Sequence, residues 1–273
     1  MVIKRGGSME NVLEEFLAVI DKLTGPDGCP WDREQTPESL ADYIIEESHE
    51  LVSAIRSGDL ADICEEMGDV AFLLLSVSRL YEKRRAFSFG DALNVGRAKM
   101  LRRHPHVFSN TVFSDLNEQL KAWEQIKRVE QADAGRQQGI FAGLPDSLPP
   151  LIKAYRIHSK AACVGFTWEN DADVEQQVEA EWLEWLDAAA NGDESDRMRE
   201  LGDLLFIIIE MGRRNGIKAN EALDLAVRRF LRRFVFMEKK AGERSQDFAA
   251  LTLEEKEALW NMAKAEEVSA PQA

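Results

Sequence analysis

Glu46-Glu47-Ser48-His49-Glu50 and, beyond a break at Gly58-Asp59, Glu65-Glu66-Met67-Gly68-Asp69 are the stretches that decide the fold of this chain. Each acidic stretch lies in a segment whose apolar residues recur at helical spacing. We expect the break to turn the chain back on itself, which places the two helices side by side. The pattern therefore predicts a helical hairpin with acidic residues on both arms.

The carboxylates of this hairpin fall on one face of each helix. Residues three apart lie about 60° apart around a helix axis, so Glu47 and Glu50 share a face, as do Glu66 and Asp69. Four carboxylates that converge in a groove repel one another strongly unless cations offset their charge. Because oxygen ligands without sulfur suit Mg²⁺ or Mn²⁺, the hairpin predicts a divalent-metal site.

The same arrangement returns in the second half of the chain. Residues of the same four types, at the same separations, lie 134 positions further on at Glu181, Glu184, Glu200 and Asp203. The same register carries Gly58-Asp59 onto Gly192-Asp193, Phe72 onto Phe206 and Cys29 onto Cys163. An internal duplication is the simplest explanation.

A solvated helix face is the ordinary explanation of a single Glu-x-x-Glu pattern. Two observations favour a metal site here. Asp203 is embedded in the apolar run 201–209 and Asp69 precedes the apolar run 70–75, where an unpartnered charge is costly to bury. The constellation also occurs twice, which a solvated face does not require.

Length and composition indicate a globular chain of two domains. It has 273 residues, of which 45% are hydrophobic and 30% charged, values typical of soluble globular proteins. We predict a first repeat at 1–130, a linker rich in glycine and proline at 131–150, and a second repeat at 151–273. No apolar run approaches the roughly 18 residues of a spanning helix, so no membrane partner is expected.

Charge and cysteine content restrict the partners and the compartment. The net charge of −15 argues against binding polymeric nucleic acid, which depends on cationic neutralisation of phosphates, but is compatible with a small phosphate-bearing ligand escorted by metal. The three cysteines are too few and too scattered for a disulfide framework or a zinc site. Because residues 1–8 also lack the apolar region of a secretory signal, we expect a cytoplasmic protein.

Helical spacing recurs along the chain, and no stretch alternates long enough to indicate a sheet, so the predicted fold class is all-α. Thr36 before Pro37 predicts a helix start, and Pro105 predicts a helix end. Cys29-Pro30-Trp31-Asp32 is interpreted as a loop whose tryptophan packs against a turn. Apart from the first acidic helix, which opens at Thr36, helices are expected over about 9–23, 60–80, 89–104, 120–131, 151–165, 175–190, 198–213, 221–240 and 253–267.

Basic residues gather in two places, 99–108 and 228–236. A basic cluster at a helix C-terminus ordinarily complements the helix dipole, but beside a carboxylate–metal site it supplies what a polyphosphate requires. His104 and His106 are interpreted as cap and packing groups rather than metal ligands. Two tryptophan–lysine pairs lie one helical turn apart, Trp123 with Lys127 and Trp260 with Lys264.

Taken together, these motifs resemble the MazG family of nucleoside triphosphate pyrophosphohydrolases. The first half carries Cys29-Pro30-Trp31-Asp32, the acidic motifs at 46–50 and 65–69, and Arg102-Arg103-His104-Pro105-His106-Val107-Phe108. The second half carries Val164-Gly165-Phe166-Thr167-Trp168 and Glu200-Leu201-Gly202-Asp203-Leu204-Leu205-Phe206. The likeness covers nearly the whole chain and includes the tandem layout.

The resemblance implies two tandem MazG-like helical repeats, each resembling a four-helix bundle, in a homodimer. It also implies Mg²⁺-dependent hydrolysis of ribo- and deoxynucleoside triphosphates to monophosphate and pyrophosphate, with Mn²⁺ as a substitute. The metal ligands and catalytic residues would be Glu47, Glu50, Glu66 and Asp69 in the first repeat and Glu181, Glu184, Glu200 and Asp203 in the second. Substrate would be bound by Arg229, Arg233, Trp260 and Lys264, with Lys99, Arg103, Trp123 and Lys127 as the first-repeat counterparts.

The chain departs from the family pattern at the leading residue of each acidic pair. Glu46 and Glu65 are present in the first half, whereas Ala180 and Arg199 stand at the matching positions of the second. In tandem members the second repeat is usually credited with catalysis. Because the first repeat here has the fuller acidic set, both repeats are candidates.

The expected chemistry is metal-assisted, in-line attack of water at the α-phosphorus. Arg229 and Arg233 would stabilise the charge that builds on the pyrophosphate leaving group. Trp260 would stack on the base, which predicts broad base selectivity because every base has a π face. The sequence leaves the general base open.

Two other classes of protein are weighed against this one. A di-iron carboxylate bundle needs Glu-x-x-His on two helices, and although Glu46 and His49 have that spacing, Leu183 stands where the repeat would need the second histidine. A helical module that binds nucleotide or protein, with one degenerate site, remains open for the second half because of Ala180 and Arg199.

Overall fold

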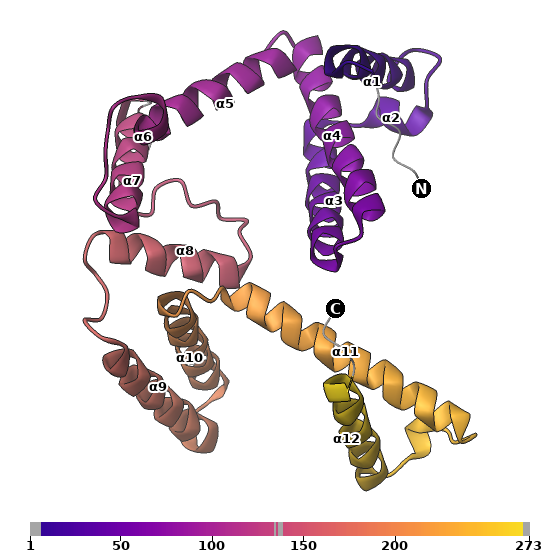
Figure 1. Ribbon diagram of the computed structural model, residues 1–273, viewed down its shortest axis with the longest axis vertical. Helices are drawn as coiled ribbons and strands as arrows, with labels where there is room; N and C mark the ends of the chain where they lie inside the picture. Colours follow the sequence, from indigo (N-terminus) through magenta and orange to yellow (C-terminus); the bar gives the residue numbers. More distant parts are fainter. Residues whose placement is uncertain (1–6, 134, 136–138, 270–273) are drawn as a thin grey trace. The chain divides into compact units, whose positions relative to one another are not determined.

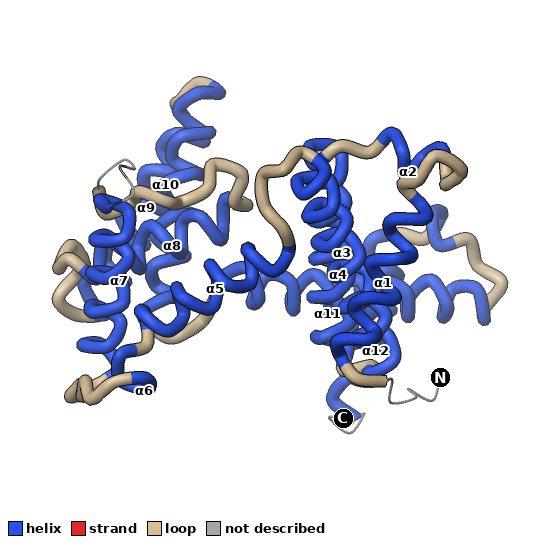
Figure 2. The backbone as a smooth tube through the Cα atoms, turned by 90° about the horizontal axis from the view of Figure 1, so that it is seen from above, coloured by secondary structure: helices blue, strands red, loops and turns tan. Residues whose placement is uncertain are grey.

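The chain is built from α-helices joined by short connections. The computed structural model describes residues 7–133, 135 and 139–269, and no strand occurs among them (Figure 2). The fold is therefore all-α, as predicted. In chain order (Figure 1) the elements are α1 Met9–Leu23, α2 Pro30–Glu34, α3 Pro37–Ser57, α4 Leu60–Lys83, α5 Phe89–Arg103, α6 Pro105–Phe108, α7 Leu116–Asp133, α8 Pro150–Cys163, α9 Asp171–Asn191, α10 Glu194–Arg214, α11 Ala219–Glu243, the 3₁₀ turn Phe248–Ala250 and α12 Leu253–Ser269.

The helices form two compact units, Met1–Val112 and Phe113–Ala273. The expected linker at 131–150 falls inside the second unit, and its positions 134 and 136–138 lie outside the described residues. The division into repeats at 1–130 and 151–273 stays a prediction from the sequence. None of the described helices combines the length and apolar character needed to cross a membrane.

The first unit is organised by the α3–α4 hairpin. Thr36 begins α3 with a capping box, in which its hydroxyl accepts from the Ser39 amide and the Ser39 hydroxyl accepts from the Thr36 amide. Gly58 ends α3 at φ 79°, a left-handed conformation that glycine adopts without strain. Asp59 then caps α4 through the amides of its first turn. The hairpin therefore follows from the local sequence, as predicted.

Helix α1 packs against α4 and covers one side of the hairpin. The rings of Phe16 and Phe72 lie 6.1 Å apart, and Arg79 pairs with Asp21 at 2.7 Å. Cys29-Pro30-Trp31-Asp32 was expected as a loop, which is wrong: Pro30 begins the one-turn helix α2. Proline has a fixed φ suited to the first helical position and needs no amide partner there.

Pro105 interrupts the basic segment at the expected place. Helix α5 ends at Arg103, and the Nδ1 atom of the capping residue His104 lies 2.7 Å from the carbonyl oxygen of Met100. The proline itself opens the short helix α6 rather than a loop. In this structure His104 is a cap, as predicted.

The second unit repeats the hairpin as α9 and α10. Asn170 caps α9, and Asp193 caps α10 through a box with Asp196. The turn requires Gly192, because a Cβ there would lie 2.8 Å from the Ala188 carbonyl oxygen. Helix α8 packs on α10, and α12 packs on α11 around the buried residues Met237, Ala241 and Leu259.

A buried charged cluster locks α10 into the second unit. Glu210 is 1% exposed and accepts hydrogen bonds from Arg213 at 2.7 and 2.8 Å and from the Thr167 hydroxyl at 3.2 Å. Burial alone would raise the pKa of Glu210, but the Arg213 guanidinium outweighs it and holds that pKa below its usual range. The repeat places Ser76 at the matching position of α4, where its hydroxyl is buried without a hydrogen-bond partner.

Replacing Glu210 with alanine should destabilise the second unit by about 3 kcal/mol, because it leaves the half-buried Arg213 guanidinium without its carboxylate. The measurement is urea unfolding followed by tryptophan fluorescence. The matched control is Ser76→Ala, which removes an unpartnered hydroxyl and should change the free energy of unfolding by less than about 1 kcal/mol. Equal effects of the two substitutions would contradict the structural role of the Glu210 cluster.

Candidate metal centres

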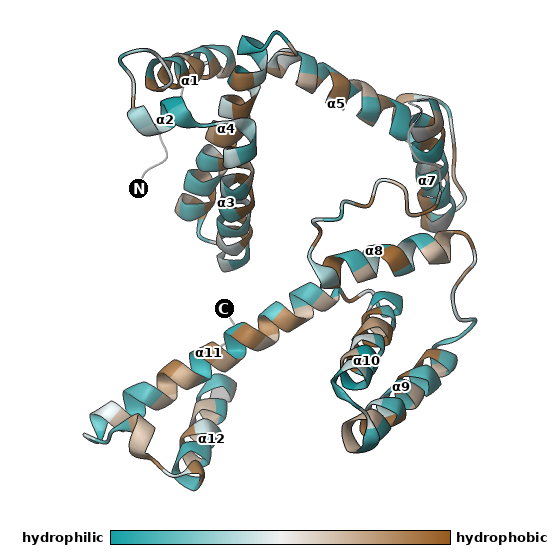
Figure 3. Ribbon diagram, turned by 180° about the vertical axis from the view of Figure 1, so that it is seen from behind, coloured by the Kyte–Doolittle hydropathy of each residue, from teal (hydrophilic) through white to brown (hydrophobic). Residues whose placement is uncertain are grey.

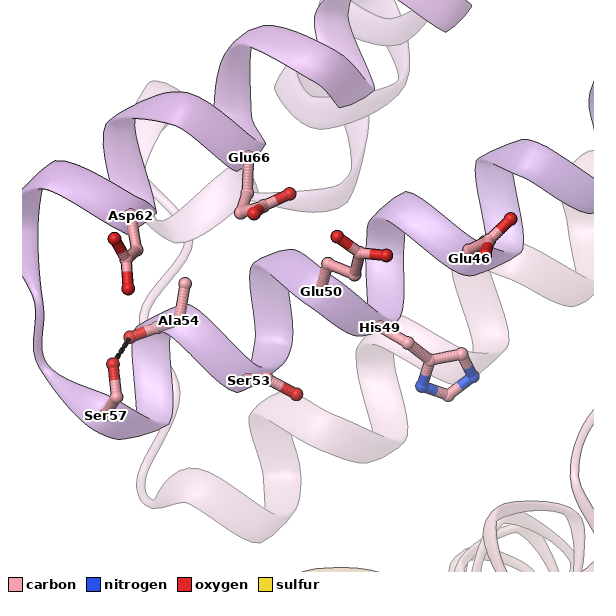
Figure 4. Close-up of a pocket in the computed structure, with 8 residues that line it drawn as sticks. All are labelled: Glu46, His49, Glu50, Ser53, Ala54, Ser57, Asp62 and Glu66. Atoms are coloured by element: carbon pink, nitrogen blue, oxygen red, sulfur yellow. Dashed lines mark hydrogen bonds between the residues drawn. The ribbon is translucent and has the colours of Figure 1, made fainter.

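The first candidate centre lies between α3 and α4. One carboxylate oxygen from each of Glu47, Glu66 and Asp69 can be chosen so that all three lie within 4.8 Å of one another. The predicted fourth ligand, Glu50, lies outside this group of three but lines the same groove as Glu66. Figure 4 shows the two side chains on facing helices, pointing toward each other. The hairpin thus brings acidic side chains from both of its arms to one groove.

The groove that adjoins the first centre, lined by Glu66 but not by Glu47 or Asp69, has a volume of about 640 Å³. That is within the range of pockets that bind small molecules. Its walls come from the last three turns of α3 and the first two of α4. They consist of Glu46, His49, Glu50, Ser53, Ala54, Ser57, Asp62 and Glu66.

Electrostatic repulsion is unrelieved in this centre. The pKa of Glu47 is raised by partial burial and then by the charges of Glu50 and Asp69. The pKa of Glu66 is also raised, first by partial burial and then by the negative charges of Glu50 and Glu47. One oxygen of Glu66, Oε2, is buried without a hydrogen-bond partner. An all-oxygen donor set with an unpartnered buried carboxylate oxygen fits a hard divalent cation.

The second candidate centre lies between α9 and α10. Oxygens of Glu181, Glu184 and Glu200 approach within 4.8 Å of one another, whereas the predicted ligand Asp203 lies outside that group. Glu200 is buried, with 8% of its surface exposed. Gln177 donates to Glu181 Oε1 at 2.9 Å. The second hairpin therefore assembles three of the four predicted carboxylates.

Arg199 makes the second centre chemically different from the first. Its Nε donates to Glu200 Oε1 at 2.9 Å, and its Nη2 lies 2.8 Å from the same oxygen. Nη2 also donates to Asp196 at 3.3 Å. The hydrogen bond to Glu200 raises the pKa of Arg199, with further contributions from the charges of Glu200 and Asp196. The sequence showed this arginine in place of an acidic residue but not that it pairs with a predicted ligand.

The predicted substrate-binding residues of the second repeat lie on α11 and α12. The Arg233 guanidinium lies 5.2 Å from the Trp260 ring centroid, a cation–π contact, and Phe230 packs 5.2 Å from the same ring. Arg229 occupies α11 one turn before Arg233, and Lys264 is exposed on α12 one turn after Trp260. The structure thus brings Arg233 and Trp260 into contact.

Glu267 is a partner of the predicted substrate-binding residue Arg233 that the sequence interpretation missed. Both Nε and Nη2 of Arg233 donate to its Oε2, at 2.9 and 2.6 Å. Arg233 lowers the pKa of Glu267, chiefly through the hydrogen bond, and Arg232 and Arg229 add to the shift. A repeated signal pointed to it: glutamate follows the tryptophan–lysine pair at the same spacing in both halves, as Trp123, Lys127, Glu130 and Trp260, Lys264, Glu267.

The first-repeat counterparts are divided between the units. Lys99 and Arg103 lie on α5 in the first unit, whereas Trp123 and Lys127 lie on α7 in the second. Lys127 pairs with Glu124 at 2.9 Å. Glu124 also accepts from the buried Lys160 of α8 at 2.8 Å, an ion pair that joins α7 to α8.

Over its described residues the chain belongs to the class of all-α proteins built from paired helices, with a carboxylate cluster in each of two matching helical hairpins. Comparison with known proteins identifies the family within this class. Residues 35–108, which span the first hairpin, match the family model of the MazG nucleotide pyrophosphohydrolase domain.

Similarity to individual proteins extends over both halves. A nucleoside triphosphate pyrophosphohydrolase of Escherichia coli K12 is 34% identical over 261 residues, which cover 94% of this chain and 99% of that protein. The nucleoside triphosphate pyrophosphohydrolase/pyrophosphatase MazG of Thermotoga maritima is 34% identical over 254 residues, which cover 93% and 96%. A nucleoside triphosphate pyrophosphohydrolase of Mycolicibacterium smegmatis is 31% identical over 189 residues, which cover 64% of this chain and 57% of that protein. This chain belongs to the MazG family of nucleotide pyrophosphohydrolases.

Proposed function

We propose that this protein hydrolyses ribo- and deoxynucleoside triphosphates to nucleoside monophosphate and pyrophosphate in a reaction that depends on Mg²⁺. The observation that carries the proposal is the cluster of Glu47, Glu66 and Asp69, whose buried, unpartnered Glu66 oxygen is suited to a hard cation. The curated relatives named as nucleoside triphosphate pyrophosphohydrolases support the reaction class. Mn²⁺ would substitute, since it accepts the same ligands.

Each group of residues has a separate task in this reaction. Glu47, Glu66 and Asp69 would hold the cation in the first centre, and Glu181, Glu184 and Glu200 in the second. A bound divalent cation supplies charge neutralisation for the triphosphate and lowers the pKa of an attacking water. Glu50, which lines the groove beside Glu66 but lies outside the group of three carboxylates, would accept a proton from that water.

Arg233 and Trp260 form the proposed nucleotide-recognition pair. A guanidinium presents a planar fork of donors that matches phosphate oxygens, and the indole offers a flat face on which a base can stack. Phe230 and the Arg233 guanidinium already contact the Trp260 ring, which fixes its orientation. Stacking does not distinguish bases, so broad base selectivity is expected.

Product analysis tests the reaction. The purified chain is incubated with Mg²⁺ and a panel of ribo- and deoxynucleoside triphosphates in H₂¹⁸O, and products are identified by mass spectrometry. Attack at the α-phosphorus places the label in the monophosphate and leaves pyrophosphate unlabelled. Glu47→Gln and Glu181→Gln variants assign the working half. Release of inorganic phosphate, or no turnover with either Mg²⁺ or Mn²⁺, would overturn the proposal.

We also infer a homodimer in the cytoplasm. Large apolar side chains are exposed on both arms of each hairpin, among them Ile55 and Leu74 in the first unit and Trp182 and Leu205 in the second. Figure 3 shows apolar residues along these helices. A two-helix hairpin needs a second pair of helices to complete a four-helix bundle, which a second copy can supply. Sedimentation equilibrium tests the stoichiometry.

Glu267 should compete with triphosphate for Arg233. Replacing it with glutamine removes its charge while keeping its shape, so the affinity for a non-hydrolysable α,β-methylene triphosphate should rise about fivefold. The measurement is isothermal titration calorimetry. The control is Glu243→Gln on α11, which removes a carboxylate that pairs with Lys240 instead. Unchanged or weaker binding in Glu267→Gln would show that this carboxylate does not occupy a phosphate position.

A further inference from the structure

We propose that Arg199 acts as a resident cation of the second centre, so that the two centres of one chain differ in their affinity for divalent metal. The inference rests on the proposed function only in taking both hairpins as metal centres. It concerns a residue at which this chain departs from its own internal repeat: Glu65 precedes Glu66 in the first centre, and Arg199 precedes Glu200 in the second.

The formal charges of the two centres differ before any ligand binds. Six positions of the first centre all carry carboxylates, which gives −6: Glu46, Glu47, Glu50, Glu65, Glu66 and Asp69. The matching positions of the second centre carry four carboxylates, one alanine and one guanidinium, which gives −3: Ala180, Glu181, Glu184, Arg199, Glu200 and Asp203. Attraction for a divalent cation scales with this charge, so the first centre should bind metal more tightly.

The position of the guanidinium turns this charge difference into a direct contact. Nε and Nη2 of Arg199 both lie within hydrogen-bonding distance of Glu200 Oε1, at 2.9 and 2.8 Å. Glu200 is buried and is one of the three carboxylates that converge in the second centre. Its matching residue, Glu66, has an oxygen that is buried without a partner. One carboxylate is therefore already neutralised from within the chain, and the other is not.

The contact between Arg199 and Glu200 can be displaced by a bound cation. The Arg199 side chain is 64% exposed, so the pair with Glu200 is weak in free energy, of the kind that ligands displace. We therefore expect the second centre to bind metal at higher concentration than the first rather than to lose binding altogether. A chain with such centres would fill them in order as the metal concentration rises.

Metal binding without nucleotide tests the inference. Free Mn²⁺ is measured by electron paramagnetic resonance during titration of the intact chain, and Glu47→Gln and Glu181→Gln assign the tight and weak classes to the first and second centres. Arg199→Glu should tighten the weak class about tenfold, and Glu65→Arg should weaken the tight class by a similar factor. Circular dichroism confirms that each variant is folded.

Arg197→Glu is the matched control. It makes the same charge change two residues earlier on α10, where Arg197 donates to the Gly192 carbonyl rather than to a carboxylate of the centre. An equal gain in Arg197→Glu and Arg199→Glu would overturn the inference, because the contact with Glu200 would then not matter. Equal affinities in the two wild-type centres would overturn it while leaving the proposed reaction intact, whereas no Mn²⁺ binding at all would overturn both.

Discussion

Replacing both Glu66 and Glu200 with glutamine should lower kcat by at least about a thousandfold while leaving the chain folded. Each substitution removes the negative charge of a carboxylate that converges with two others, and an amide oxygen is a weaker ligand for Mg²⁺. Without a bound cation, the pKa of the attacking water would not be lowered and the negative charge of the triphosphate would not be neutralised. The loss of transition-state stabilisation is worth several kcal/mol. Steady-state release of pyrophosphate is the measurement, and the two single variants assign the turnover to one half.

The same two substitutions should move thermal stability in opposite directions when metal is removed with EDTA. Burial and neighbouring carboxylates raise the pKa of Glu66, so its charged form is disfavoured in the fold and glutamine should raise Tm. Glu200 instead accepts from Arg199, so glutamine there should lower Tm. A fall in Tm for both variants would show that the first centre is not under electrostatic strain.

Replacing Arg233 with lysine should lower kcat/KM by about a hundredfold. Lysine keeps the charge but loses the planar fork that pairs with phosphate oxygens and the flat face that stacks on Trp260. The measurement is the initial rate of pyrophosphate release at low substrate concentration. The control is Arg228→Lys, on the same helix, because Arg228 pairs with Asp224 one turn earlier.

The pairing with Glu267 sharpens this test. If Arg233 alternates between Glu267 and a triphosphate, the Arg233→Lys loss should be larger in a Glu267→Gln background, where the arginine fork is free for substrate at the outset. Equal losses in the two backgrounds would show that the carboxylate and the substrate do not share the fork. A loss of similar size in Arg228→Lys would assign the effect to helix α11 as a whole.

Local sequence determined the hairpins because their signals are short-range. Thr36 and Asp59 cap helices through amides within three residues, and Gly58 adopts a left-handed turn that other residues resist. The repeat then extends the same reasoning to α9 and α10. Among the described residues, each long helix overlaps its expected span, although α7, α9 and α10 begin four residues earlier than expected. The short helices α2 and α6 were not expected, because the only signal for each was the proline that begins it.

The side-chain contacts could not be predicted from the sequence pattern. The internal repeat could align Arg199 with Glu65, but only the folded α10 shows the guanidinium lying along Glu200. Glu267 reaches Arg233 across the α11–α12 pair, over 34 positions of sequence. The repeat also could not show that Glu50 and Asp203 lie outside the closest group of carboxylates, since that depends on side-chain rotamers rather than helix faces.

The ion pair between Glu124 and Lys160 links α7 and α8 independently of the covalent chain between them. It joins the helix that precedes the glycine- and proline-rich segment to the helix that follows it, and the Lys160 side chain is almost fully withdrawn from solvent. Cleaving a peptide bond between Asp133 and Pro150 would interrupt the chain but would leave this ion pair in place. The connecting segment can therefore change in length and composition without separating the two helices that flank it.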